Sequence, residues 1–269
     1  MDWSLLPVFL LLGCVVGVLA GLLGIGGGMT IVPVLTFVFT REGFPLEHVV
    51  HLAIGTSMAT IMFTSISSVR AHHAHGAVRW PVFRAIAPGI LLASVLGPQV
   101  VGAMKTPWVA AFFGVFAAIS ALQMLLDKKP HAARQLPGPW GLFAVGNGIG
   151  FISSMVGAGG GFISVPFMAW CNVKIHNAVA TSAALGLPIA VAGTVGYVIA
   201  GLRAEGLPAH TLGYVHWPAL LGIVVASVLL APTGARLAHS WPVKKLKKAF
   251  AGMLFVLSAY MLWKAAQTW

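Results

Sequence analysis

Long apolar stretches separated by short polar segments make up most of this chain. Seven of them are long enough, or nearly long enough, to cross a bilayer: residues 5–23, 82–104, 108–126, 142–156, 178–200, 214–231 and 249–263. A spanning helix needs roughly 20 mostly apolar residues. The pattern therefore predicts an all-α integral membrane protein with several crossings.

The composition supports this class. Hydrophobic residues make up 58% of the 269 residues and charged residues only 8%, whereas about a quarter of a soluble domain is charged. The first residues, MDWSLLPVFL, lack the basic segment of a cleaved signal peptide, so we expect them to enter a retained first helix. Cys14 and Cys171 both lie in apolar stretches, where packing is a better interpretation than a disulfide.

Two glycine-rich segments interrupt the apolar pattern, GLLGIGGGMTIVPVL at residues 21–35 and SMVGAGGGFISVPFM at 154–168. Three adjacent glycines point in three directions around a helix, and each costs about 1 kcal/mol of helix stability relative to alanine. Close helix packing explains spaced glycines such as Gly17, Gly21 and Gly24 better than it explains these triplets. We therefore predict helix breaks at the two triplets, Gly26, Gly27 and Gly28 in the first and Gly159, Gly160 and Gly161 in the second.

The segments after the glycines, residues 29–40 and 162–171, are about 15–18 Å long if helical. They are too short to cross fully, so we expect half-helices or re-entrant segments, bent at Pro33 and Pro166. Counting them gives eight to ten membrane segments, four or five in each half.

The chain is an internal duplication. GIGGGMTIVP matches GAGGGFISVP, HLAIGTS matches HNAVATS, VRWP matches VHWP and ASVL recurs, all in the same order in both halves. The repeats predict a first membrane half at residues 1–127, a linker at 128–139 and a second membrane half at 140–269.

The charges predict that the halves face opposite ways. Net charge is +11, from 16 Lys and Arg against five acids, and basic loops mark the cytoplasmic side of a membrane protein rather than a nucleic-acid site here. Residues 70–84, 127–134 and 236–248 are strongly basic, whereas 202–213 and 105–108, which correspond to the first and third, are not. We expect inverted repeats with a cytoplasmic linker and both termini outside.

Broken helices at membrane depth point to a substrate site. The helix that starts after each glycine triplet has free N–H groups and a positive dipole end, which favour an anion. Interrupted segments at matching positions of inverted repeats are typical of a transporter's binding site near the midplane.

A second recurrent pattern is a histidine followed by a threonine-serine pair, His51 with Thr56 and Ser57, and His176 with Thr181 and Ser182. Hydroxyl donors suit an oxyanion without adding a fixed charge. The alternative is that each hydroxyl bonds back to its own helix. The histidines either anchor helix ends or supply a switchable charge.

The sequence gives little support for a metal site, a cation site or an enzyme active site. His72, His73 and His75 lie in a basic loop without a cysteine or acid, so we expect a solvated face rather than a metal site. All five acids lie at segment ends, which argues against a carboxylate-based cation site. No catalytic motif is evident, so we predict neither an enzyme nor a bound cofactor.

The glycine motifs GLLGIGGGMTIVPVL and VGAGGGFISVPFM, with the two His-x-x-x-x-Thr-Ser stretches, resemble the sulfite exporter TauE/SafE family of bacterial inner-membrane transporters. The resemblance covers essentially the whole chain. It implies export of small sulfur-containing anions such as sulfite, sulfoacetate or related organosulfonates, with the glycine triplets and the Thr-Ser pairs lining the pathway.

We therefore expect a multi-pass protein of the bacterial inner membrane that exports such anions, with the lipid bilayer and a small anion as its partners and no nucleic acid. The alternatives are a carrier of another small solute, such as an amino acid or a cation, and a non-transporting membrane scaffold. The sequence leaves open whether the protein forms a homodimer.

Overall fold

The computed structural model describes residues 5–23, 27–74, 76–126, 134–240 and 243–267. Within them the chain forms ten helices and one short β-pair. The first half holds α1 (Leu6–Leu23), α2 (Gly28–Arg41), α3 (Val49–Ala74), α4 (Trp80–Ala103) and α5 (Thr106–Leu126). The second holds α6 (Pro139–Val156), α7 (Gly161–Trp170), α8 (Ile175–Gly201), β1 (Thr211–Leu212), β2 (Val215–His216), α9 (Trp217–Ser240) and α10 (Val243–Gln267).

The helices have the length and composition of membrane spans. Among the described residues, five helices are long and apolar enough to cross a membrane: α3, α4, α5, α8 and the 248–267 part of α10. Shorter apolar helices accompany them in α1, α2, α7 and α9. The predicted all-α membrane class is confirmed.

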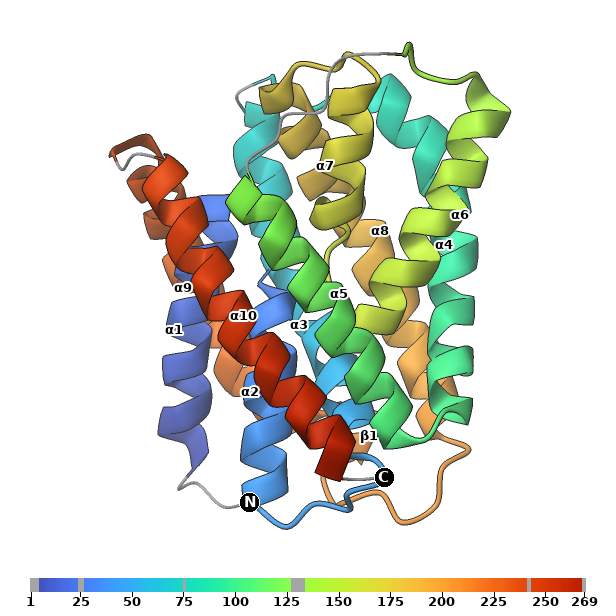
Figure 1. Cartoon of the computed structure of the whole chain (residues 1–269), viewed down its shortest axis with the longest axis vertical. Helices are drawn as coiled ribbons and strands as arrows, with labels where there is room; N and C mark the ends of the chain where they lie inside the picture. The colour runs from blue at the N-terminus through green and yellow to red at the C-terminus, as the bar shows by residue number, and fades with distance from the viewer. Residues whose placement is uncertain (1–4, 24–26, 75, 127–133, 241–242, 268–269) are drawn as a thin grey trace.

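Both predicted helix breaks are present. α1 ends at Leu23 and α2 begins at Gly28, while α6 ends at Val156 and α7 begins at Gly161. Gly27 and Gly160, which precede α2 and α7, have φ angles of 70° and 78°, a left-handed conformation that glycine adopts at little cost. Figure 1 shows that each short helix turns back toward the end from which the preceding helix came. Each break is therefore the tip of a helical hairpin inside the bundle.

The two halves interlock. α1 packs mainly on α9 of the other half, and α6 packs in the corresponding way on α4. Glycines allow these close approaches, because a β-carbon at Gly17 would lie 2.5 Å from the carbonyl oxygen of Ser227, and one at Gly150 2.7 Å from that of Ile90. Gly17 is thus a packing glycine, as its spacing indicates.

α3 and α8 pack against each other in the interior, and α5 pairs with α10. In α3, 83% of the most apolar window is buried, against 39% in α5 and α10. α3 is therefore the central helix, and α5 and α10 contribute much of the lipid-facing surface.

The ends of the bundle differ in charge. α1 begins and α10 ends at the lower end in Figure 1, whereas α5 ends and α6 begins at the upper end. The described acids Glu42, Glu47 and Glu205 adjoin helix ends at the lower side, where Arg41, Lys105 and Arg203 balance their charge. Basic residues adjoin the upper side, among them Arg70, Arg79, Arg84, Arg134 and Lys174. The inverted orientation of the halves in a membrane, and the division at residues 128–139, stay predictions.

Candidate functional site

The two helix breaks meet each other in the interior. We call the buried residues Gly27, Gly28 and 157–161 the glycine junction. Gly28 packs directly on the carbonyl oxygen of Gly157, and a β-carbon at Gly157 would lie 3.0 Å from the side chains of Val32 and Ile54. Gly26 lies outside the described residues. The remaining predicted glycines of both triplets are therefore brought to one place.

Each hairpin presents a helix start at the junction. The N–H groups of Thr30 and Ile31 bond to the carbonyl of Gly27, and those of Ile163 and Ser164 bond to the carbonyl of Gly160. The helical N–H groups before them, in Gly28, Met29, Gly161 and Phe162, have no hydrogen-bond acceptor within the described part of the chain. Such groups form the positive end of a helix.

Serine hydroxyls line the junction. Ser57 Oγ on α3 donates to the carbonyl of Gly157 at 3.0 Å. Ser182 Oγ on α8 lies 2.6 Å from Ser164 Oγ on α7, which also donates to the carbonyl of Gly160 at 2.9 Å. The two predicted serines therefore lie beside the two helix breaks, each on one of the central helices.

Sequence reasoning missed two hydroxyls. Ser164 joins the site through Ser182, and its position corresponds to Ile31 in the first half, so the repeat gave no signal. Thr30 lies in the first turn of α2, only 3% exposed, and its Oγ1 has no hydrogen-bond partner. A buried hydroxyl without a partner is costly, and its place after Gly27 and Gly28 could have drawn attention to it.

The two predicted threonines face another way. Thr56 Oγ1 accepts the backbone N–H of His216 at 3.0 Å, and Thr181 Oγ1 accepts that of Arg79 at 2.9 Å. His216 and Arg79 occupy matching places, each just before the Trp-Pro start of a helix. Each threonine therefore binds the segment that opens α9 or α4 of the opposite half.

In these contacts both threonines act as acceptors. A hydroxyl that accepts an N–H still has its own hydrogen to donate, and neither threonine donates it to an acceptor among the described residues. Both side chains are completely buried. The pair thus retains two O–H donors in the interior.

The histidines are not brought to the junction. His51 Nε2 bonds to the carbonyls of Val101 at 3.0 Å and Met104 at 3.1 Å, at the end of α4. Both partners are acceptors, so Nε2 carries the proton, and the buried Nδ1 has no partner. His176 is exposed at the start of α8. Their predicted role in binding stays a prediction.

The described residues near the junction offer few groups that could bind a cation. In the described part of the chain, no group of three or more His, Cys, Asp or Glu could hold a metal ion. The described acids adjoin the lower ends of helices, away from the junction. What converges on the junction is N–H and O–H groups.

Comparison with known proteins agrees with a transport role. A family model described as "Sulfite exporter TauE/SafE" matches residues 9–261. A "Probable membrane transporter protein" of Haemophilus influenzae is 34% identical over 95% of this chain and 97% of its own length. A similarly named protein of Methanocaldococcus jannaschii is 29% identical over 96% of both chains. No solved structure gives a significant match.

Proposed function

This chain belongs to the sulfite exporter TauE/SafE family, and on that premise we propose that it exports small sulfur-containing anions such as sulfite, sulfoacetate or a related organosulfonate. The membrane would be the bacterial inner membrane. The observation that carries the proposal is the meeting of two helix starts at the glycine junction, beside serine hydroxyls and away from every described carboxylate.

The proposed ligand follows from the donors. An oxyanion needs several hydrogen-bond donors to replace its water, and backbone N–H groups at helix starts are suitable ones. In the described residues these are the N–H groups of Gly28, Gly161 and their successors, with the unpartnered hydroxyl of Thr30 close by in sequence. The hydroxyls of Ser57 and Ser182 lie beside the breaks but already donate to the Gly157 carbonyl and to Ser164 Oγ. A cation would find no acid among them.

Charge supports an outward direction. The basic upper end attracts anions, and the basic-loop rule assigns it to the cytoplasm. A membrane potential of 100 mV, negative inside, favours the exit of each negative charge by about 2.3 kcal/mol. Export through this protein would then need no coupling ion.

The first test is a flux measurement with the full chain. Labelled sulfite should leave right-side-out vesicles faster when the interior is made negative, and inverted vesicles should take it up under the corresponding potential. Equal rates under both signs of potential would contradict electrogenic export. Flux of an amino acid or a cation but not of sulfite would assign the protein to another carrier class, and no flux at all would favour a scaffold.

The second test concerns the hydroxyls. Thr30→Val keeps the shape of the side chain but removes its O–H, whereas Thr30→Ser keeps the O–H. If Thr30 binds the anion, the valine variant should lose roughly tenfold in apparent affinity, the order of one hydrogen bond to a charged group, and the serine variant should stay near wild type. Equal affinities in the two variants would remove Thr30 from the site.

A further inference from the structure

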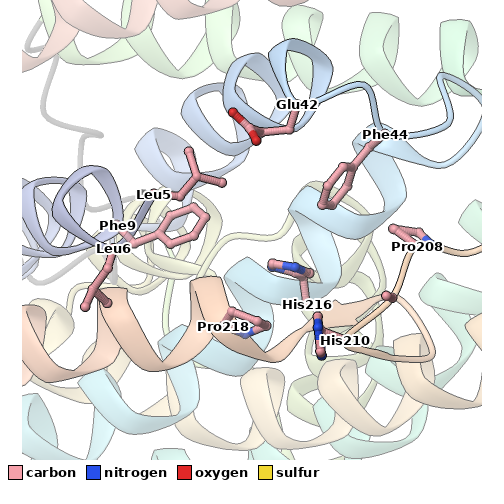
Figure 2. A pocket seen from close by; sticks show the side chains of 10 residues that line it. Leu5, Leu6, Phe9, Glu42, Phe44, Pro208, His210, His216 and Pro218 are labelled. Carbon is pink, nitrogen blue, oxygen red and sulfur yellow. The ribbon is translucent and has the colours of Figure 1, made fainter. Parts of the chain in front are cut away.

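A cavity of about 260 Å³ opens at the lower end of the bundle, the end that the charge pattern assigns to the outside. Figure 2 shows side chains from both halves around it. Its lining includes Phe9, Glu42 and Phe44 from the first half and His210, His216 and Pro218 from the second. The cavity therefore lies between residues of the two halves.

The ring of His216, which is only 6% exposed, lines this cavity. Phe39 and Phe44 stack on each other with ring centres 4.8 Å apart. The His216 ring meets both edge-on, at 5.3 Å from Phe39 and 5.4 Å from Phe44. The rings of Phe44 and His216 therefore line the cavity, and Phe39 packs against both of them.

The main chain of His216 leads directly to the interior. Its N–H donates to Thr56 Oγ1 at 3.0 Å, and the next residue on α3, Ser57, bonds to Gly157 of the glycine junction. One residue thus lines the cavity with its side chain and holds a hydroxyl next to the junction with its backbone.

The opposite half repeats this arrangement with a different side chain. Arg79 holds Thr181 through its N–H, and its exposed side chain lies at the basic upper end. A guanidinium is always charged, whereas an imidazole changes charge with pH. At these two corresponding positions the side chains therefore differ in whether their positive charge depends on pH, and a positive charge attracts an anion.

We propose that the lower cavity is the outer vestibule of the anion pathway, and that His216 and Arg79 are paired gate residues, the first titratable and the second permanently charged. This inference rests on the proposed function. With a neutral imidazole at the exit, a departing anion is released, and with an imidazolium there it is retained.

The surroundings of His216 keep its imidazole neutral at ordinary pH. Burial, and then the neighbouring His210, lower its pKa to about 4 from a usual 6.5. Among the described residues, the titratable groups that line the cavity with it are Glu42 from the end of α2 and His210 from the segment before β1. α1 contributes Leu6 and Phe9, α3 the hydroxyl of Thr56, and α9 Pro218. An outside pH near 4 should therefore charge the exit.

The test measures efflux of 2-hydroxyethanesulfonate, whose sulfonate keeps its charge over this range, from right-side-out vesicles buffered inside at pH 7.5. Each protein is scaled to its own rate at outside pH 7.5. Wild type should slow to about half its rate as outside pH falls from 7.5 to 4, where about half of the His216 imidazoles are charged, because a neighbouring cation holds an anion. His216→Gln should be flat, and His216→Arg should be slow at every pH.

Arg79→His is the matched variant. In inverted vesicles, where the upper end faces the medium, it should introduce a pH dependence that wild type lacks there. If the His216 variants do not reach the membrane, the pH dependence of efflux can be measured instead with His210→Asn. His210 has a φ of 66°, which asparagine tolerates, and the loss of its charge should move the wild-type midpoint toward neutral pH.

The outcomes separate the two proposals. A wild type that moves neither sulfite nor this sulfonate overturns the proposed function, and this inference with it. A wild type that moves the sulfonate while His216→Gln keeps the same pH profile, or while His210→Asn leaves the midpoint in place, overturns the gate alone and leaves anion export standing.

Discussion

Gly28 packs directly against the carbonyl oxygen of Gly157, so that the first turn of a helix in one half touches the helix break of the other. A methyl group added at Gly28 would overlap that oxygen and would also lie 2.7 Å from Ile61 Cδ1. Because a backbone oxygen yields little, Gly28→Ala should destabilise the protein by about 1–3 kcal/mol and abolish transport. Thermal unfolding in detergent and sulfite flux measure the two effects.

The matched control is Gly148→Ala in α6. Gly148 is exposed, and a β-carbon there would meet nothing within 4 Å. Alanine at a helical position without contacts should be neutral or stabilising by up to about 1 kcal/mol, with flux unchanged. A Gly28→Ala protein as stable and as active as Gly148→Ala would show that the two breaks are not in tight contact.

Gly160→Ala tests whether the helix break is needed for transport itself, apart from the stability lost when alanine adopts a left-handed backbone conformation. The φ of Gly160, 78°, matches that of Gly206, 73°, in the loop after α8, where a β-carbon would meet nothing within 4 Å. Alanine in a left-handed conformation costs roughly 1–2 kcal/mol, so both variants should lose at least that much stability, and Gly160→Ala also requires the Ile189 side chain to move, because the added β-carbon would lie 2.5 Å from its Cδ1. Only Gly160→Ala, which also lies beside Ile189 and the start of α7, should lose sulfite flux while still inserting in the membrane.

The comparison of these two glycines is decisive in either direction. If both variants lose flux equally, general destabilisation explains the loss and the break has no special part in transport. If neither loses flux, the glycine junction is not the substrate site.

The sequence was sufficient for the helix breaks because their cause is local. Gly27 and Gly160 need a positive φ, and a run of glycines amid apolar residues signals that need directly. The sequence alone is compatible with two paths for the chain after each break, a half-helix or a re-entrant segment. That choice depends on packing against distant helices, which periodicity does not encode.

The most buried span was the least visible. α3 does not appear among the seven apolar stretches, because Thr56, Ser57, Thr60, Thr64 and Ser65 dilute its hydropathy although all five are buried. Two of these hydroxyls, those of Thr56 and Ser57, also belong to the repeated pattern that indicates a functional helix. Adjacent side chains on it nevertheless have different partners, since Ser57 faces Gly157 and Thr56 faces His216. Only the arrangement of both halves together decides that division.

Acid should destabilise the protein through His216. Its pKa of about 4 in the folded state lies below the usual 6.5, so the unfolded chain binds more protons between these values and stability falls as pH decreases through that window. The contribution is present above pH 6.5 and is at most about 3 kcal/mol. Melting temperatures from pH 4 to 7.5 measure it.

His216→Phe keeps an aromatic ring beside Phe39 and Phe44 but cannot titrate, so its melting temperature should vary less with pH than that of wild type. His176→Gln, which alters an exposed histidine at the other end of the bundle, should leave the wild-type slope in place. An unchanged slope in the phenylalanine variant would assign the acid sensitivity to other groups.

The interlocked packing predicts that the halves need each other. α1 packs on α9 and α6 on α4, so residues 1–133 alone would expose the glycine face of α1, and residues 134–269 alone the corresponding face of α6. Co-expressed as two chains, these fragments should co-purify and restore sulfite flux. Each fragment by itself should be degraded or aggregate.

Association should depend on the glycine contacts between the halves. Gly17 lies against the backbone of Ser227, at 2.5 Å from an added β-carbon, whereas Gly252 in α10 has nothing within 4 Å. Gly17→Leu should therefore force α1 away from α9 and reduce co-purification at least tenfold, the effect of about 1.4 kcal/mol, while Gly252→Leu should leave it unchanged. Fragments with Gly17→Leu that still associate at the wild-type level would show that surfaces other than the α1–α9 contact join the halves. Accumulation of either half alone in the membrane would show that the halves do not need each other.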